Sequence, residues 1–134
     1  MSASDACLHR LFEAQARRRP GAVAVRGPDA TVTFAELTAR ADRLAAHLAG
    51  LGVRPGAVVA VAIPRSVDLV AAVLAVLGTG GAYLPIDPAD PPARVRGLLD
   101  DARPALVLAL AASAGALPAG GPPAVCVEAL AAEP

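Results

Sequence analysis

The spacing of apolar residues predicts a helix followed by a β-hairpin in the first third of the chain. Residues 8–19 are expected to form an amphipathic helix, because apolar residues recur every three or four positions and arginines gather at the end, where the helix dipole favours positive charge. Its predicted inner face consists of Leu8, Leu11, Phe12 and Ala16. Two short runs at 22–25 and 30–33 flank a Gly-Pro-Asp segment at 27–29, which is typical of a strand, a turn and a second strand.

A second helix is predicted to begin after Thr33. Glu36 follows three residues later, which is the spacing of a capping box: the Thr33 hydroxyl accepts the backbone N–H of Glu36, and the Glu36 carboxylate accepts the backbone N–H of Thr33. The helix is expected to stop at Gly52. Its predicted buried stripe consists of Leu37, Ala41, Leu44, Ala45, Leu48 and Leu51.

In the middle of the chain the period changes, and strands begin to alternate with helices. Residues 57–63 are continuously apolar, as expected for a strand covered on both faces. Ser66 is placed to cap a helix over 67–77, which is apolar nearly all round and is expected to be almost wholly covered. A short strand is predicted at 82–86, where Pro85 indicates a strand end or a sheet edge.

The last third continues the alternation. Asp90 is expected to cap a helix with Pro91 at its first position, and strands are predicted at 105–110 and 124–127. The predicted buried side of this helix consists of Val95, Leu98, Leu99 and Ala102. Strands that alternate with helices of ten or more residues imply right-handed βαβ crossovers. The predicted fold class is therefore α/β with a parallel sheet.

The glycine- and proline-rich segment LGTGGAYLPIDPADPPAR, at residues 77–94, raises the question of a phosphate-binding loop. Such a loop follows a strand and leads into a helix, because the N-terminus of the helix supplies free N–H groups and the positive end of the dipole. Here the glycines follow a predicted helix and lead into a predicted strand. The segment is therefore interpreted as a helix stop with close helix–strand packing.

Composition and charge exclude several classes of partner. The 134 residues carry a formal net charge of zero, which gives no electrostatic footprint for nucleic acid or an anionic membrane. All twelve basic residues are arginine, so the chain contains no lysine. The uncharged run Leu69–Ile86 is long enough to span a bilayer, but glycines and a proline break its second half. No membrane span is predicted.

The two cysteines are expected to be reduced. Cys7 and Cys126 lie far apart in the sequence, and neither has a second cysteine or histidine at zinc-ligand spacing that could complete a site. Charged residues near the N-terminus interrupt the position where a signal peptide needs its apolar region. These features predict a cytoplasmic protein.

Two segments resemble core motifs of the adenylation domains of non-ribosomal peptide synthetases, which are AMP-binding, adenylate-forming enzymes. TFAEL with the following TARADRLAAHL resembles the first motif, and LGTGGAYLPIDPADPPARV resembles the second, with Gly78-Thr79 where the family usually has Lys-Ala. The resemblance runs from LHRLFEAQARRRPGAVAV to PALVLAL. The matching positions that are interpreted as structural are Thr33, Phe34, Glu36, Leu37, Leu77, Gly80, Gly81, Ala82, Tyr83, Leu84, Pro85 and Asp87.

The resemblance implies that residues 1–134 are the N-terminal portion of the large adenylate-forming core, truncated before its phosphate-binding loop. The complete family enzyme uses ATP and Mg²⁺, a loop ending in Pro-Lys-Gly, and a second lysine in a mobile C-terminal subdomain; this chain has no lysine for either role. No catalytic, cofactor-binding or metal-binding residue is therefore assigned, and the chain is expected to be inactive alone. The implied partners are the remainder of an adenylation domain and a carrier protein.

Two alternatives remain open at the level of sequence. One is a fragment of an acyl-CoA synthetase-like enzyme, and the other is a non-catalytic interaction module derived from the same scaffold. If the chain is a fragment, the apolar helix at 67–77 and the outer strands are expected to lack the elements that cover them in the larger fold. The isolated fragment is therefore expected to self-associate or to be only marginally folded, whereas a self-sufficient interaction module is expected to be a stable monomer.

Overall fold

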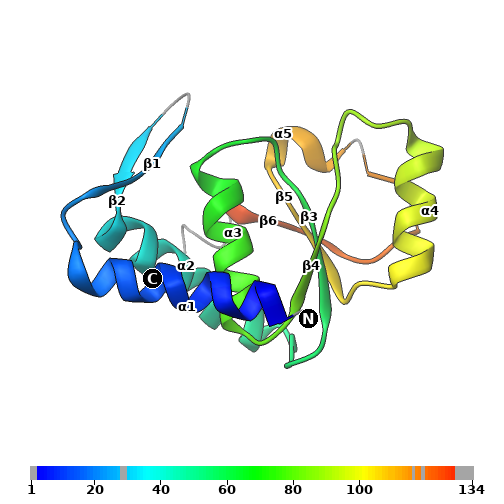
Figure 1. The fold of residues 1–134 in the computed structure, drawn as a ribbon. Coiled ribbons are helices and arrows are strands. Elements are labelled where there is room, and N and C mark those ends of the chain that lie inside the picture. The colour runs from blue at the N-terminus through cyan, green and yellow to red at the C-terminus, as the bar shows by residue number, and fades with distance from the viewer. Residues whose placement is uncertain (1–2, 28–29, 116, 119, 129–134) are drawn as a thin grey trace.

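The computed structural model describes residues 3–27, 30–115, 117–118 and 120–128, and side chains from residue 10 onward. The elements in chain order are α1 (Ala3–Arg18), β1 (Val23–Arg26), β2 (Thr31–Thr33), α2 (Phe34–Gly50), β3 (Val58–Ala62), α3 (Val67–Gly78), β4 (Ala82–Pro85), α4 (Pro92–Ala102), β5 (Leu106–Ala109), α5 (Ala111–Ala114) and β6 (Ala124–Cys126). Figure 1 shows their arrangement. The alternation of helices and strands matches the order predicted from the sequence.

The main sheet is parallel and has the strand order β4-β3-β5-β6. Val59 of β3 lies between Tyr83 of β4 and Leu106 of β5 in the register, so β3 is an inner strand. The predicted α/β class and its parallel βαβ units are confirmed. A separate two-stranded antiparallel sheet is formed by β1 and β2. Two residues of the predicted hairpin turn, Pro28 and Asp29, lie outside the described residues.

Helices cover both faces of the main sheet. The chain passes from β3 through α3 to β4, and then returns through α4 past β3 to β5. These two crossovers run in opposite directions, and right-handed crossovers of opposite direction place their helices on opposite faces. Accordingly, α2 and α3 pack on one face and α4 packs on the other (Figure 1).

A third apolar cluster joins the hairpin to the helices beside the sheet. Its buried residues are Val32, Leu37, Val67 and Ala71, with Phe12 of α1 packed against them. The rings of Phe12 and Phe34 lie 5.6 Å apart between centroids. The cluster fixes α1 and the hairpin against α2 and α3.

The apolar helix α3 is covered by other elements of this chain, which corrects the expectation that it would be left in water. Six of its residues are buried, and no other residue of α3 except Gly78 is exposed. Its neighbours are α1, α2 and the sheet. Among the described side chains, the exposed large hydrophobic residues are Leu11, Val23 and Leu51.

Two residues assigned to inner faces by spacing are exposed instead. Leu11 is 63% exposed, because α1 directs Phe12 rather than its neighbour toward the third cluster. Leu51 is 51% exposed, because α2 ends at Gly50 and Leu51 follows as its C-cap, outside the regular stripe. Gly52 has a φ of 94°, so the predicted helix stop is in place. The predicted position of Leu8 falls on a side chain outside the described part of the structure.

The predicted cap of α4 is wrong. The N-cap is Pro91, which makes no side-chain capping bond, and the helix begins at Pro92. Asp90 therefore lies one residue too early to cap, and its carboxylate instead lies 3.4 Å from Nε of Arg94. A single helical turn, α5, was also not predicted in the segment that follows β5. None of the helices in the described ranges has the length and apolar character needed to cross a bilayer.

Candidate functional site

A crevice lies at the carboxyl ends of β3 and β4, where their connections leave on opposite faces of the sheet. Open α/β sheets bind ligands outside the carboxyl ends of their strands, most often where the strand order reverses. In this sheet that reversal lies between β3 and β5, beside the crevice. The crevice has a volume of about 590 Å³. Its apolar lining consists of Val61, Ile63, Pro64, Leu69, Pro85, Ile86, Pro88 and Leu98, and its charged lining consists of Arg65, Asp87, Asp90 and Arg94.

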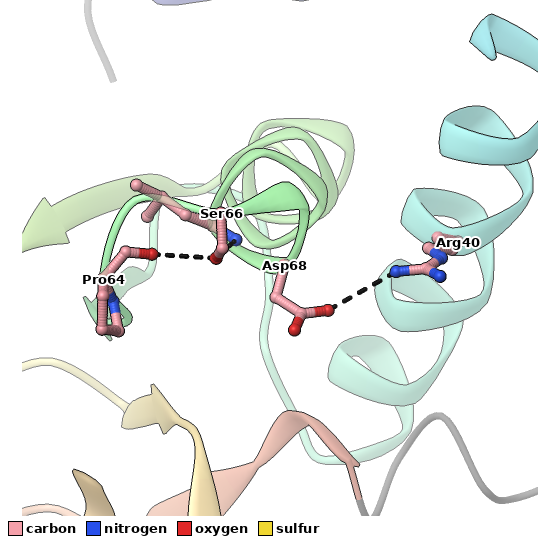
Figure 2. A network of polar contacts seen from close by, with 5 residues as sticks. Arg40, Pro64, Ser66 and Asp68 are labelled. Carbon is pink, nitrogen blue, oxygen red and sulfur yellow. Dashed lines mark hydrogen bonds and ion pairs between the residues drawn. The ribbon is translucent and has the colours of Figure 1, made fainter. Parts of the chain in front are cut away.

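The turn from β3 into α3 forms one wall of the crevice and is fixed by Ser66 (Figure 2). The Ser66 hydroxyl donates to the carbonyl oxygen of Pro64 at 2.8 Å and accepts the backbone N–H of Leu69 at 3.1 Å. Ser66 is thus the N-cap of α3, as the sequence predicts. Asp68, in the first turn of α3, lies 3.6 Å from Arg40 of α2 and links the two helices (Figure 2).

The charges around the crevice are largely used in local contacts. Asp90 pairs with Arg94, and one carboxylate oxygen of Asp87 accepts the backbone N–H of Ala89 at 2.9 Å. Two arginines and two aspartates line the crevice, so their formal charges cancel. The arrangement offers an apolar floor with a neutral rim.

The first core motif lies at the N-terminus of α2 and caps it. Glu36 N–H donates to Oγ1 of Thr33 at 3.2 Å, and Thr33 N–H donates to Oε1 of Glu36 at 3.0 Å, which is the predicted capping box. Leu37 is buried in the third cluster, and Phe34 faces Phe12. The hydrogen bond from the Thr33 backbone, and then that from its hydroxyl, lower the pKa of Glu36 below its ordinary value.

The Glu36→Gln variant is expected to show the pH dependence of this cap. Because the pKa of Glu36 is lowered by folding, its carboxylate contributes stability above the ordinary glutamate pKa of about 4.3, and that contribution is lost as the pH falls through the lower folded value. Glutamine still accepts the Thr33 N–H, but it does not titrate. The difference in unfolding free energy between wild type and variant, measured with urea, is expected to shrink on acidification. A difference independent of pH would contradict this.

The second core motif extends along β4, starting at its amino end. Leu77 is buried, Gly80 has a φ of 80°, and a Cβ on Gly81 would lie 2.9 Å from the carbonyl oxygen of Ala57. The glycines therefore end α3 and allow its close approach to the sheet, as predicted. Strand residues Ala82, Tyr83, Leu84 and Pro85 follow. Asp87, after the carboxyl end of β4, is the motif residue that reaches the crevice together with Pro85.

The structure does not bring the two core motifs into one site. The first motif lies in the third cluster. The glycines of the second motif lie at the amino end of β4, whereas the crevice lies at its carboxyl end. Sequence reasoning missed Arg65, Arg94 and the Arg40–Asp68 pair. For Arg65 the available signal was its place just after a strand, because residues that follow parallel strands lie at the same end of the sheet. Arg94, Arg40 and Asp68 lie within helices, where the sequence pattern gives no such signal.

A second hollow, of about 820 Å³, lies among α1, α2 and α3. Phe12 and Ala16 line it from α1, and Ala39 and Thr38 line it from α2. The Thr38 hydroxyl oxygen is buried and has no hydrogen-bond partner among the described residues. Many of the side chains that line the hollow are small, and its lining is mostly apolar.

The described residues do not fit the groups that ATP and Mg²⁺ require. A phosphate loop needs glycines that lead into a helix N-terminus, whereas Gly78 to Gly81 follow the C-terminus of α3. No group of three His, Cys, Asp or Glu side chains in the described ranges is placed to hold a metal ion. No chemical step is therefore derived through nucleotide or metal on these residues.

Comparison with known proteins gives consistent matches. The model of the family described as AMP-binding enzyme matches residues 12–133. The chain is 51% identical over 104 residues to the phosphinothricin tripeptide synthetase PhsB of Streptomyces viridochromogenes, covering 77% of this chain and 9% of the relative. It is 47% identical over 110 residues to the malpinin synthetase of Mortierella alpina, covering 82% of this chain and 1% of the relative.

Solved structures show the same fold. The non-ribosomal peptide synthetase FmoA3 superposes with a TM-score of 0.83 at 40% identity, covering 90% of this chain and 13% of that chain. Klebsiella oxytoca NpsA, in complex with 3-hydroxyanthranilyl-AMSN, superposes with a TM-score of 0.83 at 24% identity, covering 92% of this chain and 25% of that chain. The family match over residues 12–133, the peptide-synthetase relatives and the shared fold confirm the resemblance seen in the two core motifs: the chain belongs to the AMP-binding enzyme family, and it corresponds to a short N-terminal part of an adenylation domain.

Proposed function

We propose that this chain is the N-terminal scaffold of an amino-acid-activating adenylation domain, which forms aminoacyl adenylates from ATP in non-ribosomal peptide synthesis. The observation that carries the proposal is the match to peptide synthetases, at 47–51% identity in the two relatives named above, over a segment that forms the parallel sheet and its covering helices. In this proposal ATP, Mg²⁺ and the amino acid are held by other parts of the domain. The twelve core-motif residues shape the scaffold and take no part in the chemistry.

Three further proposals concern the surroundings of the chain. One solved structure with the same fold is an artificially fused adenylation–PCP di-domain. We therefore propose a carrier protein as a partner of the complete enzyme.

We place the chain in the cytoplasm, in keeping with the half-buried, unpaired thiol of Cys126. We also propose that the isolated chain self-associates. Because its apolar faces are largely covered, open strand edges are the favoured contact.

The purified chain is expected to show no amino-acid-dependent exchange of pyrophosphate into ATP and no saturable ATP binding. The physical reason is that its glycine-rich turn lies at the negative end of a helix dipole and the chain has no lysine. Exchange is measured with each amino acid against a heat-killed control. Exchange above that control would overturn the scaffold proposal.

A chimaera tests the same proposal by asking whether this segment supports the activity of a host domain. Residues 12–133 replace the matching segment of an active peptide-synthetase adenylation domain. The chimaera is expected to retain pyrophosphate exchange with the amino-acid preference of its host, because the substituted segment supplies scaffold only. A changed preference would show that this segment selects the amino acid, and a folded but inactive chimaera would favour an interaction module.

A further inference from the structure

A single helical turn covers the carboxyl end of the main sheet at the point where the strand order reverses. α5 (Ala111–Ala114) directly follows β5, and the Ser113 hydroxyl donates to the carbonyl oxygen of Ala62, the last residue of β3, at 3.5 Å. β3 and β5 are the strands on either side of the reversal. α5 therefore lies over the kind of position where open α/β sheets bind ligands (Figure 1).

Little within α5 itself holds it in this place. None of its four residues is buried, and its sequence is Ala-Ala-Ser-Ala, so it buries very little apolar surface against the sheet. Its N-cap, Leu110, has no side-chain oxygen that could accept the first N–H groups of the turn. An isolated turn is unstable, because it fixes several residues for few hydrogen bonds. Groups outside α5 are therefore needed to keep it formed.

Glu128 supplies the missing acceptor from the segment that follows β6. Both carboxylate oxygens of Glu128 lie 3.0 Å from the backbone nitrogen of Ala111, which is 17 positions earlier in the chain. A hydrogen bond to a carboxylate is stronger than one to a neutral oxygen. In the described part of the chain, Glu128 and Ser113 are the side chains that tie α5 to the neighbouring strands by hydrogen bonds. Glu128 makes the shorter contact, and it does so from an exposed position.

We propose that α5 is a lid held closed by the Glu128 carboxylate, and that it opens as a local unit while the sheet stays folded. Segments with few buried apolar contacts open at a lower free-energy cost than core strands, and Ala62 and Ala109 at the ends of β3 and β5 are fully buried. Opening uncovers these strand ends and extends the crevice across the reversal. The inference uses only contacts within this chain and does not rest on the proposed adenylation function.

Hydrogen exchange of the folded chain, followed by NMR with increasing low concentrations of urea, tests whether α5 opens locally. The amides of Ser113 and Ala114 donate to the carbonyl oxygen of Leu110, so they report the turn, and the amide of Ala111 reports its bond to Glu128. A local opening exposes little surface, so the exchange of these three amides is expected to be faster than that of β3 and β5 and nearly independent of urea. Exchange of α5 at the same rate and with the same urea dependence as the strands would overturn the proposal.

The Glu128→Ala variant tests what holds the lid closed. Loss of one net hydrogen bond is expected to make the amide of Ala111 exchange about two- to tenfold faster, and the amides of Ser113 and Ala114 are expected to follow it. The matched control is Asp100→Ala, which removes an exposed carboxylate from α4 and is expected to leave exchange in α5 unchanged.

Glu128→Gln keeps an acceptor oxygen without the charge, so its exchange is expected to lie between those of wild type and Glu128→Ala. Unchanged exchange of Ala111 in Glu128→Ala, or equal acceleration in Asp100→Ala, would show that Glu128 does not hold the lid. Unfolding of the whole chain by Glu128→Ala would show that the carboxylate supports the sheet rather than a lid. None of these outcomes bears on the chimaera, so the two proposals fail separately.

Discussion

Replacing Leu108 with alanine is expected to lower the free energy of unfolding by about 2–5 kcal/mol. Leu108 lies on the inner strand β5, has 0% of its surface exposed, and belongs to the cluster between the sheet and the helices α2 and α3. The truncation removes apolar contacts and leaves a cavity. Neighbours on paired strands close it only partly, because their backbones are held by the ladder. Urea unfolding followed by circular dichroism measures the change.

The matched control for Leu108 is the same substitution at Leu51. Leu51 is 51% exposed and lies after the end of α2, so Leu51→Ala is expected to change stability by no more than about 0.5 kcal/mol. The comparison also checks the correction of the predicted α2 stripe. Equal losses at the two positions would show that Leu51 is packed in solution.

The Gly81→Ala variant is expected to lose about 1–3 kcal/mol. The added Cβ would lie 2.9 Å from the carbonyl oxygen of Ala57 and 3.3 Å from Oγ1 of Thr79. Ala57 O also accepts the N–H of Ala82 at 2.9 Å, a hydrogen bond that joins the start of β4 to the β3 segment. Relief of the clash therefore shifts the start of β4, so the cost falls on the sheet itself.

Gly97→Ala is the matched control for Gly81→Ala. Gly97 lies inside α4, and a Cβ there would meet nothing within 4 Å. Alanine is the better helix former, so this variant is expected to gain about 0.5–1 kcal/mol. Thermal unfolding of both variants measures the opposite signs. A loss at Gly97 comparable to that at Gly81 would contradict the steric argument.

The parts of the fold that sequence predicted correctly depend on local signals. Thr33 and Ser66 cap their helices as predicted because a cap needs only a hydroxyl and an N–H within one turn. The order of strands and helices was also predicted, since the hydrophobic period changes at each boundary. The cap of α4 failed because Pro91 and Pro92 shift the start of the helix by one residue, which moves Asp90 out of reach.

The crevice was not predicted because it depends on strand order. Its walls form only when β4 and β5 lie on either side of β3, so that α3 and α4 leave on opposite faces. The sequence pattern predicts each strand, but it does not predict which strands lie beside it in the sheet. Arg65 and Asp87 lie 22 positions apart, and their shared position at one sheet edge follows from the pairing of β3 with β4. A local reading of either residue indicates only a loop.

The inner position of β3 also affects how the chain folds during synthesis. Val59 pairs with Leu106, which is 47 residues further along the chain. As the ribosome releases β3, the β5 strand beside it has not yet been made, and non-local strand pairs of this kind form slowly. The nascent β3 therefore remains apolar and unpaired on its β5 side until β5 has been made. Among the strands of the main sheet, residues 58–62 are thus expected to be accessible for longest to chaperones that bind extended apolar segments.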